Sequence, residues 1–99
     1  MKTNIQFVHS ETSSSAEQLV QKKLEKLENK YDWIISADVL FKEENDTNGK
    51  GKICAIELHL PGPRIHASSN EDSFEAAAAE TVNDIQKQLV KRKAEMKSF

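Results

Sequence analysis

Hydrophobic residues in the first third of the chain follow two different periods. From Thr3 to His9 they alternate with polar residues, which predicts a half-buried strand. The segment Ser14–Glu17 then has the Ser-x-x-Glu spacing of a helix capping box. After it, apolar residues return every three or four positions, so we expect a first helix from about Ser15 to Lys30. Its apolar stripe consists of Ala16, Leu19, Val20, Leu24, Leu27 and Tyr31.

The middle of the chain returns to strict alternation. The segment Ile34–Glu43 predicts a second strand, and the polar segment Asn45–Gly51, with two glycines, predicts a hairpin loop. A third strand, with one wet face, is expected over Cys54–Leu60. Pro61-Gly62 suits the central positions of a type II turn, because proline fixes φ and glycine accepts a positive φ. A short fourth strand follows, with Ile65 and Ala67 facing inward.

The last quarter of the chain predicts one long helix, from near Asp72 to about Met96. Such a helix is longer than strands of five to eight residues, so its last two turns should project beyond the sheet. Its apolar stripe consists of Phe74, Ala77, Ala78, Thr81, Val82, Ile85 and Leu89.

These elements predict an α+β fold in the order β-α-β-β-β-α. We expect a four-stranded, mostly antiparallel sheet with both helices packed on one face, formed by a single domain over residues 1–99. The expected core contains Ile5, Phe7, Leu24, Leu27, Val39, Phe41, Ile56, Leu58, Phe74, Val82, Ile85 and Leu89.

Composition narrows the class of protein. Hydrophobic residues make up 37% of the chain and charged residues 30%, which is typical of a small soluble domain with a thin core. No apolar run approaches the length of a membrane span, so we expect no membrane partner. The lone Cys54 cannot form an intramolecular disulfide, which agrees with a cytoplasmic protein.

Charge is segregated along the closing helix. The ionisable residues between Asn70 and Asp84 are all acidic, whereas those from Gln86 onward are five basic and one acidic. The helix dipole favours this order, but it does not require so many cations. Although the net charge is −2, a concentrated positive end suits phosphate and suggests a nucleic-acid partner met at one face. The basic residues are Lys87, Lys91, Arg92, Lys93 and Lys97.

The sequence gives little indication of metal binding or catalysis. Glu57, His59 and His66 should share the face of the sheet away from the helices, but their spacing matches no metal-binding motif, so no metal is expected. Cys54 belongs to the inward set, where cysteine behaves as a small hydrophobe. Trp33 suits a packing position at the rim of the core, and a base-stacking platform is the alternative. No triad, Gly-rich loop or carboxylate pair is visible, so we expect no enzyme, cofactor or small-molecule substrate.

Four segments carry a resemblance that covers nearly the whole chain. In order and spacing they resemble the short ribosome hibernation factors, the ribosome-associated translation inhibitor family formerly labelled sigma-54 modulation proteins. The segments are Lys23–Asp32 followed by Ile34, Leu58–Gly62 followed by Ile65–Ala67, Asp72–Ala77, and Gln88–Leu89 followed by Lys91–Lys93.

The resemblance implies a function without catalysis. Such factors bind the small ribosomal subunit between its head and platform, in the channel used by tRNA anticodon ends and mRNA, and silence and preserve ribosomes in stationary phase or stress. The implied partner is therefore the small subunit with its 16S-type rRNA. The alternative is a protein-interaction regulator of transcription that acts without binding RNA. The rRNA-binding residues implied by matching positions are Lys22, Lys23, Lys26, Lys30, Lys87, Lys91, Arg92 and Lys93.

The chain departs from the family pattern in two respects. Gln86, Val90 and Glu95 occupy positions that are basic in many relatives. The chain also ends at Phe99, so we expect no C-terminal dimerisation domain and a monomer away from the ribosome.

Two stripes of cations are expected to meet. Lys22, Lys26 and Lys30 follow an i, i+4, i+8 spacing and form one exposed stripe, which could equally be a solvated face interleaved with Glu25 and Glu28. With both helices on one side of the sheet, we expect this stripe and the basic end of the closing helix to form one continuous positive face.

Overall fold

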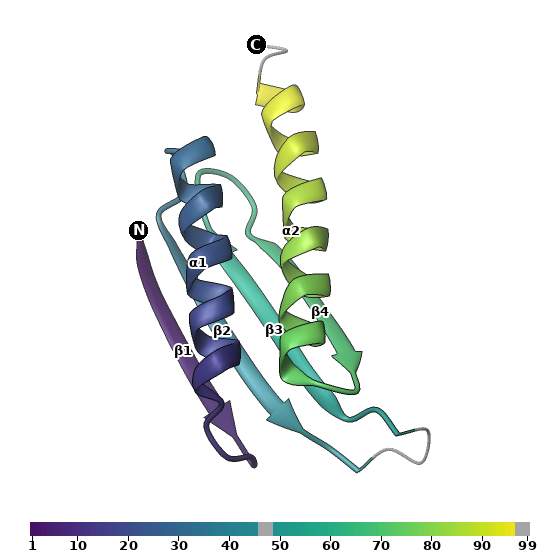
Figure 1. Ribbon diagram of the computed structural model, residues 1–99. Coiled ribbons are helices and arrows are strands. Elements are labelled where there is room, and N and C mark those ends of the chain that lie inside the picture. The colour runs from purple at the N-terminus through teal and green to yellow at the C-terminus, as the bar shows by residue number, and fades with distance from the viewer. Residues whose placement is uncertain (46–48, 97–99) are drawn as a thin grey trace.

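The structure, a computed structural model, describes residues 1–45 and 49–96. It confirms the expected order of elements (Figure 1). The expected loop over residues 45–51 is described only at its ends, and Lys97 lies outside the described residues. The elements are β1 (Lys2–Val8), α1 (Ser14–Lys30), β2 (Ser36–Glu43), β3 (Lys52–His59), β4 (Ile65–Glu71) and α2 (Phe74–Met96).

The four strands form one mixed sheet in the order β1-β2-β3-β4. β1 is parallel to β2, whereas β2–β3 and β3–β4 are antiparallel. Two parallel neighbours need a crossover connection, and α1 supplies it. Both helices cover the same face of the sheet and run in the same direction, so their C-terminal ends lie at the same end of the molecule (Figure 1).

Element boundaries differ from the expectation at both helix starts. α1 is capped by Ser13, whose Oγ accepts a hydrogen bond from the Ala16 amide at 3.3 Å, so the capping box expected at Ser14 is wrong by one residue. α2 is likewise capped by Ser73, which accepts from the Ala76 amide at 3.1 Å, and not by Asp72. In both cases the cap hydroxyl accepts a hydrogen bond from the amide three residues later. Only one residue in each polar segment has the position needed for this bond.

β4 is longer than expected. It pairs with β3 from Leu58↔Ile65 to Lys52↔Glu71. Polar residues hid this strand in the sequence, because an edge strand with one wet face need not be apolar. The turn between β3 and β4 contains Gly62 with φ of 88°, the positive value that the expected type II turn requires.

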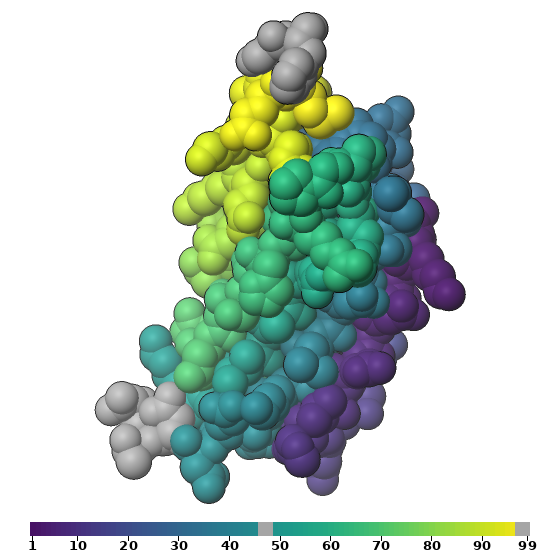
Figure 2. Space-filling view, turned by 180° about the vertical axis from the view of Figure 1, so that it is seen from behind, coloured from purple at the N-terminus to yellow at the C-terminus, as the bar shows by residue number. Residues whose placement is uncertain are grey.

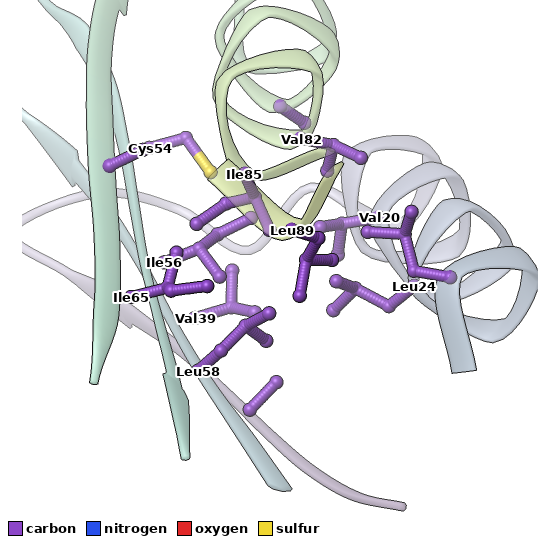
Figure 3. Packing of buried hydrophobic residues seen from close by; sticks show 14 of the residues in the cluster. Val20, Leu24, Val39, Cys54, Ile56, Leu58, Ile65, Val82, Ile85 and Leu89 are labelled. Carbon is purple, nitrogen blue, oxygen red and sulfur yellow. The ribbon is translucent and has the colours of Figure 1, made fainter. Parts of the chain in front are cut away.

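The core lies between the helices and the inner face of the sheet. Figure 3 shows Val20 and Leu24 of α1 and Ile85 of α2 meeting the aliphatic side chains of the strands. All twelve expected core residues join this packing, but Ile5 and Phe7 are half-buried and lie against the cluster. The reason is their place on β1, which is an edge strand.

Cys54 and Thr81 carry polar atoms inside the core. Cys54 is fully buried, as expected, and burial raises the pKa of its thiol to about 12, so the thiol stays protonated and unreactive. Thr81 is also fully buried, and its hydroxyl lies within hydrogen-bonding distance of the carbonyl oxygens of Ala77 (2.8 Å) and Cys54 (3.0 Å). The hydroxyl is therefore satisfied inside the core.

Shortening either of two core side chains should destabilise the fold strongly. Leu27 is 5% exposed and Ile85 is fully buried, so Leu27→Ala or Ile85→Ala should lower the free energy of unfolding by about 2–5 kcal/mol. Val90 is 53% exposed, and Val90→Ala should change it by less than about 0.5 kcal/mol. Urea unfolding followed by circular dichroism measures all three. A loss from Val90→Ala as large as that from Ile85→Ala would contradict the assigned core.

Candidate nucleic-acid interface

The lysines of α1 lie away from the side of this helix that meets the start of β1. Lys22, Lys26 and Lys30 are exposed and Lys23 is half-buried. Glu28 marks the opposite side, where it accepts a hydrogen bond from the terminal amino group of Met1 at the start of β1. At roughly 100° per residue, Lys30 points about 200° away from Glu28 around the helix. Lys30 therefore points away from β1.

Lys93 of α2 reaches the same place. Its Nζ lies 5.7 Å from the centroid of the Tyr31 ring, and the Nζ of Lys30 lies 5.5 Å from the same centroid. Both distances fall within the range of a cation–π contact. Because Tyr31 is only 1% exposed, its ring is a fixed support. It holds one cation from each helix at the same end of the molecule.

Trp33 supports the tyrosine from another side. Its ring meets the Tyr31 ring edge-on, with centroids 5.7 Å apart and an interplanar angle of 71°. The indole is half-buried and packs against the core. This position agrees with the rim-packing role expected of Trp33.

The remaining lysines of α2 point elsewhere. Lys87 and Lys91 are exposed, and Lys91 lies roughly 200° around the helix axis from Lys93. Since Lys93 faces α1, Lys91 points away from it. Only part of the basic end of α2 therefore lies beside α1, and the continuous positive face across the two helices stays a prediction.

Arg92 is tied to the β3–β4 turn. Its Nη1 donates to the carbonyl oxygen of Pro61 at 3.1 Å and its Nη2 donates to that of Pro63 at 2.7 Å. One helical turn earlier, the side-chain amide of Gln88 donates to the carbonyl oxygen of His66 at 2.9 Å. Arg92 therefore lies beyond the last buried residue of α2, Leu89, but is held by the turn, which the sequence did not predict. Figure 2 shows the green turn lying against the yellow end of α2.

Of the eight residues expected to bind rRNA, the structure brings Lys30 and Lys93 together at one ring. Sequence reasoning missed Tyr31 as the support of two cations and Gly62 as the neighbour of Arg92. The adjacent Lys30 and Tyr31 at the end of α1 could have indicated the role of Tyr31. No signal links Arg92 to a turn about thirty residues earlier, because its partners are main-chain carbonyls. The other three lysines of α1, Lys22, Lys23 and Lys26, precede Lys30 along the same helix.

The opposite end of the helix pair is acidic. The Glu75 carboxylate accepts hydrogen bonds from the hydroxyls of Ser15 at 2.5 Å and Ser13 at 3.4 Å. These bonds, that from Ser15 most strongly, hold the pKa of Glu75 below its ordinary value. A carboxylate from α2 thereby sits at the N-terminus of α1, where the helix dipole favours negative charge.

The outer face of the sheet has no helix over it (Figure 2), and it carries polar side chains from all four strands. Asn4, Asp38, Glu57 and His66 occupy one row across the four strands. Asp38 accepts from Asn4 at 3.1 Å and lies 2.8 Å from the imidazole of His59. The hydrogen bond from Asn4, and then the contact with His59, hold the pKa of Asp38 below its ordinary value.

Two of the three outer-face residues considered as metal ligands have protein partners. Glu57 forms an ion pair with Arg64 at 2.8 Å, and His59 is engaged by Asp38. Within residues 1–45 and 49–96, no three His, Cys, Asp or Glu side chains are grouped to hold a metal ion. In the same ranges, no helix combines the length and apolar character needed to cross a membrane.

Comparison with known proteins identifies the family. The family described as sigma 54 modulation protein / S30EA ribosomal protein matches residues 3–97. The chain belongs to this family. Members are ribosome-associated factors and not a known family of enzymes. No curated protein sequence matches the chain significantly.

Two solved structures share the fold. A ribosomal subunit interface protein from Coxiella burnetii is 24% identical, with a TM-score of 0.81, and the match covers 95% of this chain and 99% of that one. The N-terminal domain of Protein Y from Thermus thermophilus is 22% identical, with a TM-score of 0.71, over 89% of this chain and 94% of that one. At these identities the likeness establishes the shared fold.

The hydrogen bonds to Glu75 predict that the stability of the fold falls at low pH. Because its pKa is lower in the folded protein, ionised Glu75 stabilises the fold. This stabilisation is complete above the ordinary glutamate pKa of about 4.3 and is lost as the pH falls through the lower, folded value. Glu75→Gln should therefore lower the melting temperature at pH 7 and reduce its fall between pH 5 and pH 3. Equal acid dependence in the variant and the unaltered protein, measured by calorimetry, would contradict this role.

Proposed function

We propose that this protein binds the small ribosomal subunit through the junction of α1 and α2 and inhibits translation by occupying the channel for tRNA and mRNA. The observation that carries the proposal is the convergence of Lys30 and Lys93 on one buried tyrosine. This contact supports the proposal because it involves one lysine from each helix. Occupancy alone excludes anticodon ends, so the function needs no catalytic group.

The chemistry of the surface suits RNA phosphate. Lysines that neutralise phosphates release condensed counterions, which favours binding irrespective of base sequence. The junction therefore recognises the shape and backbone of rRNA. Its principal contacts are Lys22, Lys26, Lys30 and Lys93, with Lys23 beside them. Lys87 and Lys91, on the far side of α2, serve as flanking contacts.

Family membership supports a ribosomal partner. One of the two similar structures fits this partner, since it is a ribosomal subunit interface protein. We infer a cytoplasmic protein that acts as a single domain, is monomeric away from the ribosome, and preserves inactive ribosomes in stationary phase or stress. The competing function, regulation of transcription through protein contacts, requires no positive surface at the helix junction.

Charge reversal at the junction should weaken binding to the small subunit. Lys26→Glu and Lys93→Glu each replace attraction to phosphate with repulsion, so each should reduce affinity at least about tenfold, or roughly 1.4 kcal/mol. The control Lys2→Glu makes the same change at an exposed position on the outer face of the sheet. Co-sedimentation with purified small subunits measures all three. Full binding by a folded Lys26→Glu/Lys93→Glu protein, with lost binding by Lys2→Glu, would assign the outer face instead.

The salt dependence of binding separates RNA from protein docking. Each neutralised phosphate contributes a slope of about −0.7 to −0.9 in log K against log salt. Five lysine contacts therefore predict a total slope of about −3.5 to −4.5, and the double reversal should flatten it. A slope near zero for the unaltered protein would favour a protein partner.

A further inference from the structure

We infer that Arg92 is a positioning residue for the RNA-binding junction: it anchors the end of α2 to the β3–β4 turn and thereby holds Lys93 over Tyr31. The effect of Arg92 on RNA binding rests on the proposed function. Its effect on the position of Lys93 can be measured in the free protein.

The end of α2 has little other support. The helix has 23 residues and is about 34 Å long, whereas the seven residues of β4 extend about 23 Å. Leu89 is the last buried residue of the helix, and from Val90 to Met96 every residue except Arg92 is exposed. Helix ends without buried contacts open locally at low cost. The cationic end of α2 therefore needs an anchor to keep a fixed position.

Arg92 has the geometry of such an anchor. Its two terminal nitrogens bind two different carbonyl oxygens, those of Pro61 and Pro63, so the planar guanidinium is fixed in orientation. Gln88 makes a third bond to the same hairpin, at His66. Together these bonds attach one side of α2 to the hairpin, and Lys93, the next residue, then meets Tyr31 on the side toward α1.

The turn is shaped to receive the guanidinium. A Cβ added to Gly62 would lie 3.2 Å from Nη1 of Arg92, closer than most carbon contacts, and Gly62 has a positive φ of 88°. Gly62→Ala should therefore displace the Arg92 guanidinium from the turn without changing any charge. This provides a variant that is independent of Arg92 itself.

The first test is made on the free protein. Lys93 ε-methylene protons near the Tyr31 ring should have NMR shifts displaced from those of an exposed lysine. Arg92→Lys, which keeps the charge but lacks the fork, and Gly62→Ala should both move these shifts toward the exposed value. Lys91→Ala, on the far side of α2, should leave them unchanged. Unaltered Lys93 shifts in a folded Arg92→Lys protein would overturn the inference.

The second test is a double-mutant cycle in small-subunit binding. At 0.15 M salt, one lost phosphate contact is worth about a four- to fivefold change in affinity by counterion release. Arg92→Lys should therefore weaken binding by up to about that factor, and should have no further effect on a Lys93→Ala protein. The same loss in both backgrounds would mean that Arg92 contacts RNA directly, which overturns the positioning role.

The two hypotheses fail in different ways. If the unaltered protein does not bind small subunits, the proposed function is wrong, yet the NMR shifts still decide whether Arg92 positions Lys93. If the unaltered protein binds and Arg92→Lys changes neither shift nor affinity, the function stands and the anchor is rejected.

Discussion

The parallel pairing of β1 with β2 is the constraint on which the arrangement of charge depends. Two consecutive parallel strands must be joined by a crossover, and α1 is that crossover, so it runs opposite to both strands. Two antiparallel steps then bring the chain through β3 and β4 to the same direction as β2. α2 returns along the sheet in the direction of α1. Both helices therefore begin at one end of the molecule and finish at the other (Figure 1).

Parallel helices concentrate their dipoles. The two N-termini place partial positive charge at one end, where Glu75 bridges to Ser13 and Ser15. The two C-termini place partial negative charge at the other end, where Lys30 and Lys93 share the Tyr31 ring. The same cations that complement the dipoles are thus available to phosphate. Stability and the proposed binding function use one distribution of charge.

Much of this fold could be predicted from the sequence because the hydrophobic period changes cleanly between two and 3.6. The caps were harder, since adjacent serines such as Ser13 and Ser14 have similar propensities and only tertiary packing selects one. The α1 lysines could be placed on one stripe by their spacing. The position of Arg92 could not be predicted, because its partners are carbonyl oxygens of a distant turn and any residue type presents a carbonyl. Spacing puts Lys91 and Lys93 on opposite sides of α2, but only the fold shows that Lys93 is the one beside α1.

Lysine footprinting can show directly which face of the protein contacts the small subunit. The protein is acetylated with a lysine-specific reagent, free and bound to subunits, and the reactivity of each lysine is read by mass spectrometry. We expect Lys22, Lys26, Lys30 and Lys93 to lose reactivity on binding. Lys2 and Lys42, on the outer face of the sheet, should remain as reactive as in the free protein. Protection of Lys2 and Lys42, with the helix lysines still reactive, would contradict the proposed interface.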